Sequence, residues 1–504
     1  MQINEKKSSL VIKNVFYGFG SKLIILVLGI IIPRLVITSF GSELNGFLST
    51  ITQIFTYFAL LEAGIGNSAV NALYSPLENS DYNKANFVMA QARSYYRKAT
   101  AVYIALVVAF AFGYPFLMGS TLSKSLMIKV VLLQGLPSAI SYYFCAVYEQ
   151  LLMADGKRYI SENVALIHHL LTSGSKILLI LLGFDIIAVQ VAFLVISILK
   201  IPVVVLYCKK KYKWLSFKQK GEQNLLKERS AFVVHEVSST IFSNTDVIII
   251  SIFCGFEMAS VYTVYNMVFS ALNSLVNTAN SGLGFVLGRN LDKPREDFHK
   301  IFDIYSSLYS LAVFAIMTTA TVLSIPFVTL YTSGIHDVNY VDMWMPILFG
   351  LINVMSGARA IHARLITVSG HAKQTQYRSV AEMIINIVFS LILVYLFDIY
   401  GVLLGTIVAL LYRMNDIIIY AEKKILKRSC LCAYINLLSN LALFALAVCT
   451  ASNIAWRVES YFTLCLYGAI CFVLLVAVFS VPFLITNRHN LSDLSKIIRS
   501  YLRK

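Results

Sequence analysis

The sequence predicts an all-α polytopic membrane protein with about 14 transmembrane helices. Three observations lead to this fold class. Hydrophobic residues make up 58% of the 504 residues, charged residues only 13%, and the mean hydropathy is +0.72. Apolar stretches follow one another along the chain, and most exceed the ~20 residues that cross a bilayer as a helix. Most of the 42 Lys and Arg residues fall in every second gap between these stretches.

The apolar stretches define the expected helices. Inside a bilayer every backbone N–H and C=O must be hydrogen-bonded, which leaves helices or closed barrels, and these runs are too long for barrel strands. We therefore expect helices over residues 14–36, 44–72, 97–118, 127–151, 160–183, 185–208, 229–252, 258–288, 301–332, 341–364, 375–397, 399–421, 429–455 and 460–486.

The charge pattern predicts the orientation of the chain. The gaps on one side, together with both chain ends, carry the Lys and Arg residues, whereas the opposite gaps hold only Arg34, Lys124 and Arg457. Cytoplasmic loops of membrane proteins are enriched in these residues, so we expect both termini in the cytoplasm. The net charge of +16 therefore reflects topology, and we expect no nucleic-acid partner.

A weak internal repeat indicates two lobes. Residues 40–43 match residues 254–257, and residues 184–186 match residues 397–399, both at a spacing of about 214 residues. Each copy would hold six spans, so both copies share one orientation and form parallel repeats. We expect an N-lobe over residues 1–213, a C-lobe over 214–426, and two further helices with a cytoplasmic tail over 427–504. Transporters of this design bind substrate near mid-membrane, between the lobes.

Charged side chains within apolar spans are costly and mark candidate functional positions. Lys22 lies about eight residues into its helix, roughly 12 Å deep, and the repeat aligns it with Glu236. We hypothesise that these two residues pair as a gate or share the substrate cavity. Arg34 follows Pro33 near the outer surface, and it either extends to the interface or belongs to an outer gate.

The fifth span carries three polar residues that we expect to line a cavity and bind substrate: Lys176, His168 and His169. His168 and Lys176 are about two helical turns apart, so they can share a face. Four other basic residues lie closer to span ends, where long side chains can extend to the interface. These four residues are Lys129, Lys200, Arg359 and Arg413.

Three acids are candidates for a gate or for coupling to an ion. Glu62 lies within the segment LEAGIGNSAV, where it either binds a proton or cation or makes a local hydrogen bond in helix packing. Asp246, within SNTDVIII, is the other acid within a span that could bind a coupling ion. The sequence does not choose between Glu62, Glu236 and Asp246, nor between H⁺ and Na⁺.

Motifs for enzymatic chemistry are absent from the sequence. It contains no Walker A motif, no HExxH motif and no Rossmann glycine fingerprint, and the gaps between spans are short. The eight Cys lack metal-ligand spacing. We therefore expect a protein that is not an enzyme, with no catalytic residue, no metal site and no cofactor apart from a coupling ion.

Residues 31–77, IIPRLVITSFGSELNGFLSTITQIFTYFALLEAGIGNSAVNALYSPL, resemble the opening two helices of Wzx-type bacterial polysaccharide flippases. This branch belongs to the MOP superfamily, together with MATE exporters and lipid II flippases. The likeness extends to a basic, tyrosine-rich segment and, beyond it, to the number of spans and the layout of the lobes. The segment contains Arg93, Tyr95, Tyr96, Arg97 and Lys98.

The resemblance implies a flippase of the bacterial cytoplasmic membrane. Such a protein moves undecaprenyl-pyrophosphate-linked oligosaccharide from the inner to the outer leaflet by alternating access, for capsule, exopolysaccharide or O-antigen assembly. It also implies a cationic central cavity, for which Lys22, Arg34 and Lys176 are the candidates here. The implied partners are the lipid-linked glycan, membrane lipids, and the polymerase and glycosyltransferases of the same pathway. Two alternatives stay open: a MATE-like exporter of another substrate, and a non-transporting membrane component of the assembly machinery.

Overall fold

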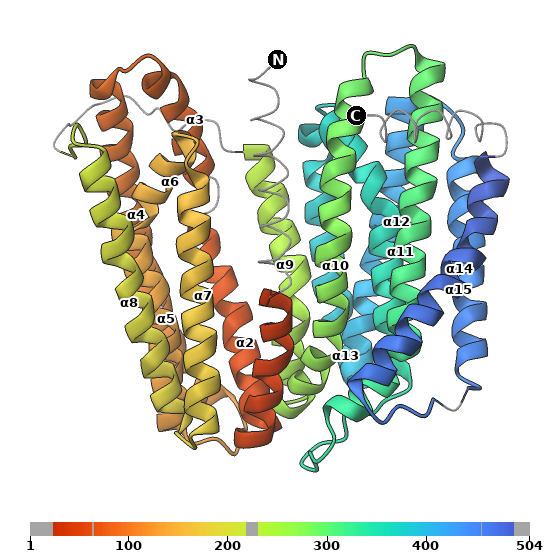
Figure 1. Cartoon of the computed structure of the whole chain (residues 1–504), viewed down its shortest axis with the longest axis horizontal. Helices are drawn as coiled ribbons and strands as arrows, with labels where there is room; N and C mark the ends of the chain where they lie inside the picture. Colours follow the sequence, from red (N-terminus) through yellow and green to blue (C-terminus); the bar gives the residue numbers. More distant parts are fainter. Residues whose placement is uncertain (1–23, 63–64, 218–229, 455, 488–504) are drawn as a thin grey trace. The chain divides into compact units, whose positions relative to one another are not determined.

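A computed structural model of the chain describes residues 24–62, 65–217, 230–454 and 456–487 (Figure 1). Over these residues the chain forms helices joined by short turns, and no strand. The predicted all-helical fold class is confirmed. The chain divides into two compact units: Met1–Thr240 with Gly255–Glu257, and Ile241–Cys254 with Met258–Lys504. The predicted lobe boundaries at residues 213 and 426 stay a prediction.

The helices of the first unit form a bundle. They are Ile24–Phe40, α2 (Ser42–Ala59), the 3₁₀ turn η1 (Leu60–Glu62), α3 (Ile65–Glu78), α4 (Tyr82–Leu117), α5 (Lys124–Phe144), α6 (Ala146–Ala154), α7 (Arg158–Leu181) and α8 (Ile186–Lys211). α4 packs on α5, α5 on α8, and α8 on α7, so these long helices run alongside one another (Figure 1).

Polar caps and apolar faces explain where these helices begin and what they bury. Asp81, Ser123 and Asp185 precede α4, α5 and α8, and each side chain accepts a hydrogen bond from a backbone N–H of the first turn. Phe47 and Ile51 of α2 are fully buried in the apolar core. In α7 and α8, by contrast, only 17% of the most apolar window is buried, so most of their apolar surface is left for lipid.

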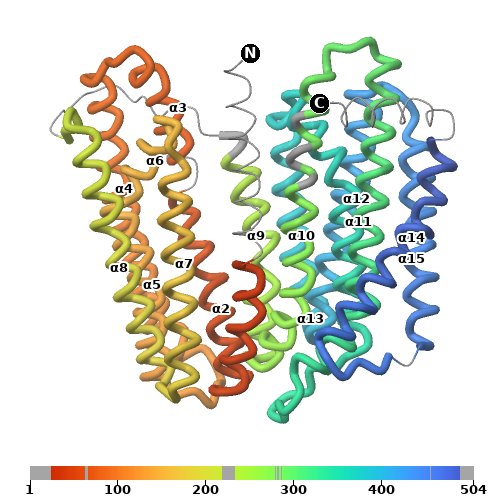
Figure 2. The backbone as a smooth tube through the Cα atoms, viewed as in Figure 1, coloured from red at the N-terminus to blue at the C-terminus, as the bar shows by residue number. Residues whose placement is uncertain are grey.

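The second unit contains the remaining helices, and the division between the units falls within α9. The helices are α9 (Ser230–Phe253), α10 (Phe256–Asn290), α11 (Arg295–Tyr331), α12 (Trp344–Val368), α13 (Ala372–Tyr420), the π-helical turn η2 (Ala421–Leu426), α14 (Leu431–Ala451) and α15 (Tyr461–Asn487). α12 packs on α11 and α13, and α15 packs along α11 and α14 (Figure 2).

A sharp break divides α13 into two limbs. The backbone leaves the helical region at Phe397 and Asp398, where Asp398 has a φ of +49°. A Cβ added to Gly405 would lie 2.5 Å from the backbone nitrogen of Ser390 in the other limb. Glycine therefore allows the two limbs to pack backbone against backbone. The break coincides with the boundary that the sequence predicts between the spans 375–397 and 399–421.

Two turns that the repeat aligns have the same backbone geometry. Gly41 and Gly255 both have a φ of +89°, a conformation that favours glycine. Each residue directly precedes a helix, Gly41 before α2 and Gly255 before α10. The shared conformation agrees with the repeat at this pair of turns.

The described residues contain fewer helices of membrane-spanning length and hydropathy than the 14 that the sequence predicts. Ten helices there are long and apolar enough to cross a membrane, so the chain is a multi-pass membrane protein. One of them, Ala372–Leu426, contains the break in α13 and covers two predicted spans. Ile24–Phe40 is shorter, and α9 and α10 are not among the ten. The count of 14 and the cytoplasmic location of both termini stay predictions.

Candidate functional site

Of the predicted pair Lys22 and Glu236, only Glu236 lies among the described residues. Lys22 lies outside the described residues, so its cavity role and its pairing with Glu236 stay predictions. Glu236 lies on α9 and is exposed. Arg34 lies on the helix Ile24–Phe40 and is half-buried. The hydroxyl of Thr38 donates a hydrogen bond to the backbone oxygen of Arg34 at 2.9 Å, one turn along the same helix.

The three polar residues predicted on the fifth span all lie on α7, and two of them face α8. Nε2 of His168 lies 3.0 Å from the hydroxyl oxygen of Ser197. Nζ of Lys176 lies 4.8 Å from the ring centre of Phe193, close enough for a cation–π contact. Nε2 of His169 is buried and has no hydrogen-bond partner in the described part of the chain. The expected common face of His168 and Lys176 is therefore the one turned toward α8.

Glu62 lies at the interruption between α2 and α3. Its Oε1 accepts a hydrogen bond from the Tyr96 hydroxyl at 3.1 Å, and the same hydroxyl accepts one from Nε2 of Gln150 at 3.2 Å. The neighbouring Tyr95 hydroxyl donates to the backbone oxygen of Leu61 at 3.2 Å. These contacts hold the interruption against α4 and α6. They correspond to the local hydrogen bond that the sequence left open, and the ion-coupling role of Glu62 stays a prediction.

Asp246 lies on α9 and is only 5% exposed. Its carboxylate accepts hydrogen bonds from the Thr406 hydroxyl, at 2.9 Å to Oδ2, and from the Tyr262 hydroxyl at 3.2 Å. These partners come from the second limb of α13 and from α10. A buried carboxylate is expensive unless its lone pairs are satisfied, and hydroxyl groups from two further helices perform that function here.

Polar oxygen atoms continue beside Asp246 along the two limbs of α13. Nδ2 of Asn386 donates to the Thr406 hydroxyl at 2.8 Å, while Oδ1 of Asn386 is buried without a hydrogen-bond partner among the described residues. The Ser390 hydroxyl donates to the backbone oxygen of Val402 at 3.2 Å. We call Asp246, Asn386 and Thr406 the Asp246 cluster. Carboxylate, amide and hydroxyl oxygens are the donor types that bind hard cations.

The sequence identified Asp246 and missed the residues around it. Ser, Thr and Asn are common in transmembrane helices, so Thr406 and Asn386 carry no signal individually. A signal exists in the spacing, because every buried residue between positions 375 and 390 of the first α13 limb is polar, and only Ala372 and Val394 at its two ends are not. The polar residues are Thr375, Gln376, Ser379, Glu382, Asn386 and Ser390.

Arginine and carboxylate groups alternate between α12 and the two limbs of α13. Glu382 contacts Arg359 and Arg413, and Asp416 contacts Arg413 and Arg378. The side chain of Arg413 is only 6% exposed. Arg359 and Arg413 are therefore accommodated by buried acids, and the expectation that they extend to the interface is wrong.

The first unit has a comparable ion pair. Nζ of Lys200 on α8 lies 3.0 Å from Oε1 of Glu149 on α6, and the Lys200 side chain is 18% exposed. Lys200 therefore has an acidic partner, and the expectation that it extends to the interface stays a prediction. Lys129 on α5 is exposed, as that expectation requires.

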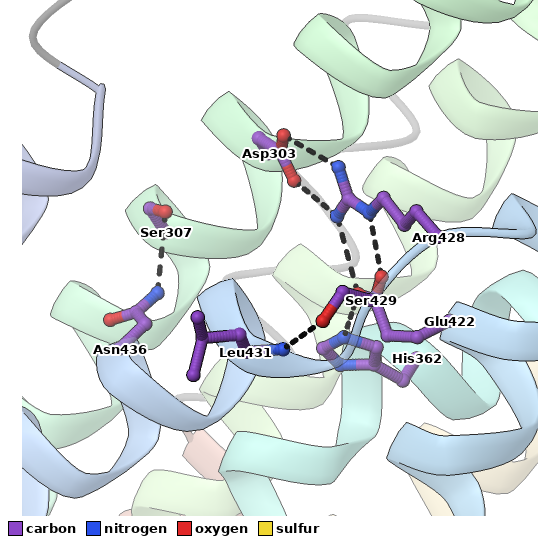
Figure 3. Close-up of polar contacts among 8 residues, drawn as sticks. All are labelled: Asp303, Ser307, His362, Glu422, Arg428, Ser429, Leu431 and Asn436. Atoms are coloured by element: carbon purple, nitrogen blue, oxygen red, sulfur yellow. Dashed lines mark hydrogen bonds and ion pairs between the residues drawn. The ribbon is translucent and has the colours of Figure 1, made fainter.

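A cluster that we call the Arg428 clasp joins the start of α14 to three other elements (Figure 3). The Arg428 guanidinium donates two hydrogen bonds to Asp303 of α11, at 2.8 and 2.5 Å, and one to Oε2 of Glu422 at 2.6 Å. Nε2 of His362 on α12 lies 3.3 Å from Oε1 of Glu422. Glu422 is 1% exposed, so the guanidinium neutralises a carboxylate that would otherwise be buried alone.

An apolar pocket of about 540 Å³ lies among α11, α12 and α14 in the second unit. Trp344, Trp456 and Pro326 are among the residues that line it. Trp is enriched at membrane interfaces. Because most of the residues that line it are apolar, the pocket is suited to an apolar chain rather than to a charged group.

The chain is similar to known proteins in its three-dimensional structure. No protein-family model matches the chain, and no curated protein matches its sequence. A structure of the lipid II flippase MurJ in an inward closed conformation is similar, with a TM-score of 0.66 at 17% sequence identity. The similarity covers 94% of this chain and 100% of that chain.

Two other solved transporters share the fold. An inward-facing multidrug resistance MATE family transporter of the MOP superfamily has a TM-score of 0.61 at 14% identity, over 84% of this chain and 95% of that one. A MOP superfamily transporter from Pyrococcus furiosus has a TM-score of 0.55 at 14% identity, over 81% and 94%. The names of these proteins describe transporters and a flippase, and the expectation that this chain is not an enzyme stays a prediction. The chain therefore has the fold of the MOP superfamily transporters, whereas the Wzx-type branch stays a prediction.

Proposed function

We propose that this chain is a flippase that moves undecaprenyl-pyrophosphate-linked oligosaccharide from the inner to the outer leaflet of a bacterial cell membrane by alternating access. Capsule, exopolysaccharide or O-antigen assembly would use the product. The observation that carries the proposal is the fold shared with the lipid II flippase MurJ over nearly the whole of both chains.

The charges and pockets of the described residues support a lipid with a phosphorylated head. Lys176 lies within an apolar helix and has no acidic partner in the described part of the chain, so its ammonium group is available to an anion. Arg34 is a second cation on an apolar helix of the first unit. The apolar pocket beside Trp344 and Trp456 is suited to part of a polyprenyl tail.

The MATE-like fold also favours a second candidate function, export of another substrate. The two candidates differ in the charge that the cavity must accommodate. A cationic drug would be repelled by Lys176, whereas a pyrophosphate would be attracted. Loss of transport on neutralising Lys176 therefore favours the flippase, and a gain in export of a cationic drug favours the exporter.

We further propose that the Asp246 cluster binds the coupling ion, either Na⁺ or H⁺. The residues fit a small cation because Asp246 supplies a carboxylate, Thr406 a hydroxyl oxygen and Asn386 an amide oxygen that has no partner among the described residues. A bound cation or proton would neutralise the buried carboxylate. Tyr262 orients that carboxylate by donating a hydrogen bond to it.

The test of the flippase proposal is a leaflet assay with purified protein. Proteoliposomes would contain undecaprenyl pyrophosphate linked to a fluorescent oligosaccharide, and dithionite added outside would quench only the outer leaflet. We expect the protein to increase the quenchable fraction with time, and Lys176→Ala to slow that increase about tenfold, the equivalent of 1.4 kcal/mol. Flipping no faster than in protein-free vesicles would contradict the proposal, and a fluorescent phospholipid controls for general scrambling.

A further inference from the structure

Arg364 differs from the other arginines near it in the second unit. Arg359, Arg413 and Arg428 each contact a carboxylate. Arg364 lies on α12, one turn before that helix ends at Val368, and it makes no hydrogen bond or ion pair within the described part of the chain. Its Nε is buried and finds no acceptor among the described residues. A buried N–H of a charged group costs at least about 1–3 kcal/mol of stability when it has no partner. A ligand that supplies a hydrogen-bond acceptor here would therefore bind favourably.

Two other buried polar groups near Arg364 also lack a partner among the described residues. The hydroxyl of Tyr309 on α11 lies within electrostatic range of the Arg364 guanidinium, and Tyr309 is 5% exposed. Asn280 on α10 is 7% exposed, and its Oδ1 accepts no hydrogen bond from any residue that the structure describes. Asn280 lies one turn before Gly284, on the same face of α10.

Gly284 connects these groups in space. A Cβ added to Gly284 would lie 2.8 Å from Cδ of Arg364, so α10 approaches the stem of the arginine where α10 has no side chain. The arginine thus extends from α12 against α10, with Tyr309 of α11 nearby. α11 and α12 therefore bring a phenol and a guanidinium together beside α10, and neither group is fully satisfied within the described part of the chain.

The chemistry of these groups selects the class of ligand. A guanidinium presents paired N–H donors that match two oxygens of a phosphate, and a phenol adds a further donor. The orphan amide oxygen of Asn280 is an acceptor and supplies no donor to such a ligand. The end of α12 at Val368 is predicted to face the cytoplasm. A phosphate at that depth belongs to the head of a membrane lipid. We propose that Arg364 and Tyr309 form a binding site for the phosphate of a lipid at the cytoplasmic end of the second unit.

Two lipids could supply this phosphate. One is the polyprenyl pyrophosphate of the proposed substrate, in which case the site rests on the proposed function and would receive the substrate head. The other is an anionic phospholipid of the bilayer. The purified full-length chain would be examined by native mass spectrometry with undecaprenyl pyrophosphate, with phosphatidylglycerol and with zwitterionic phosphatidylcholine as separate probes.

We expect Arg364→Gln to weaken binding of undecaprenyl pyrophosphate, phosphatidylglycerol or both by about tenfold, since it removes a charged pair of donors. Arg364→Lys keeps the charge and should lose about threefold. Tyr309→Phe removes only the hydroxyl and should also weaken binding about threefold. Arg158→Gln, which changes an exposed arginine at an ion pair on α7, is the matched control and should leave binding unchanged.

The outcomes separate this site from the proposed function. If Arg364→Gln and Tyr309→Phe bind both lipids as tightly as the unmodified chain, the site is wrong, whatever flipping shows. If only phosphatidylglycerol binding depends on Arg364, the site stands as a phospholipid site and is not part of the substrate path. A structural role for Arg364 would instead lower the unfolding temperature of Arg364→Gln without changing lipid affinity in the folded fraction, and Tyr309→Phe would then bind normally.

Discussion

Asp246, Glu62 and Glu236 illustrate how much one side chain depends on residues far away in sequence. Glu236 is exposed, Glu62 is held by a hydrogen bond from Tyr96, and Asp246 is buried among hydroxyl groups. The sequence could name these three acids, because an acid within an apolar span is rare. It could not rank them, because Thr406 reaches Asp246 across 160 positions of the chain.

Replacement of the Asp246 carboxylate tests its proposed role. We expect Asp246→Asn to reduce ion-driven flipping at least tenfold and to remove its dependence on a Na⁺ or pH gradient, because the amide cannot carry the negative charge. Stability should change by about 1 kcal/mol or less, since the amide keeps the shape and can still accept a hydrogen bond from Tyr262. The measurement is the leaflet assay under each gradient, with exposed Asp292→Asn as control. Unchanged gradient dependence in Asp246→Asn would exclude Asp246 as the ion site.

Asp155 lies outside the spans, in the turn between α6 and α7, and it gives a prediction about pH. Burial raises the pKa of its carboxyl group, but hydrogen bonds from the Lys157 ammonium and the Tyr212 hydroxyl lower the pKa by more than burial raises it. The pKa of Asp155 therefore lies below its ordinary value. A lowered folded-state pKa contributes stability above the ordinary pKa of about 3.9, and this contribution is lost as the pH falls through the folded-state value.

We expect Tyr212→Phe to lower stability at pH 7 by about 1 kcal/mol or less, because one hydrogen bond to the half-buried Asp155 carboxylate is removed. The difference from the unmodified chain should shrink as the pH falls below about 4, where the Asp155 carboxylate becomes protonated in both proteins. Thermal unfolding between pH 3 and 7 checks this. Tyr207→Phe, on the same helix, is the matched control, and an equal pH dependence in all three proteins would show that the Tyr212 hydroxyl does not set the Asp155 pKa.

At the scale of elements, α13 shows what hydropathy can and cannot predict. Two apolar runs separated near Asp398 predict two helices, because each run alone spans a bilayer. The close approach of the limbs depends on Gly405 lying opposite Ser390, a register that only the three-dimensional structure supplies. The same register aligns Asn386 with Thr406 and so brings together two of the three residues of the Asp246 cluster.

A pair of glycine substitutions tests the close packing within α13. We expect Gly405→Ala to destabilise the protein by about 1–3 kcal/mol, because its Cβ would overlap the backbone of Ser390, which cannot easily move. Gly174→Ala in α7 is the matched control, since nothing lies within 4 Å of its Cβ, and it should stabilise by about 0.5–1 kcal/mol. Thermal unfolding of the two purified variants gives both values, and equal effects would contradict the packing argument.

At the scale of the whole molecule, the sequence predicts the fold class and the structural relatives well. The reason is physical: a bilayer requires long apolar helices, and the resulting pattern survives at 17% identity to MurJ. Sites are harder to predict, because their chemistry depends on partners from other helices. Arg413, which the sequence places at an interface, is buried between Glu382 and Asp416. Nothing in the sequence distinguishes Arg364 from other arginines, and only the structure shows that its buried Nε lacks an acceptor among the described residues.

Reporter fusions test the predicted orientation of the chain. We expect alkaline phosphatase to be active when fused after Gly119, Gly183 or Gly334, and inactive after Ser80, Gly156 or Gly370. The physical reason is the excess of Lys and Arg on the side of the second group, which holds those turns in the cytoplasm. A green fluorescent protein series should give the opposite pattern. Reversed activity at all six positions would mean that the termini lie outside, and a pattern that fails to alternate would contradict the count of spans.

The Arg428 clasp has a consequence for how a gene of this kind can evolve. The sequence predicts that the last two helices are an addition to two six-span lobes, yet Arg428, which precedes these helices, neutralises acids on α11 and η2. Loss of the extension would strand Asp303 and the buried Glu422 as uncompensated anions, and breaking such a pair costs about 3–5 kcal/mol. We therefore expect relatives that lack these helices to carry neutral residues at the positions of Asp303 and Glu422, a correlated change that a comparison of homologous sequences can check.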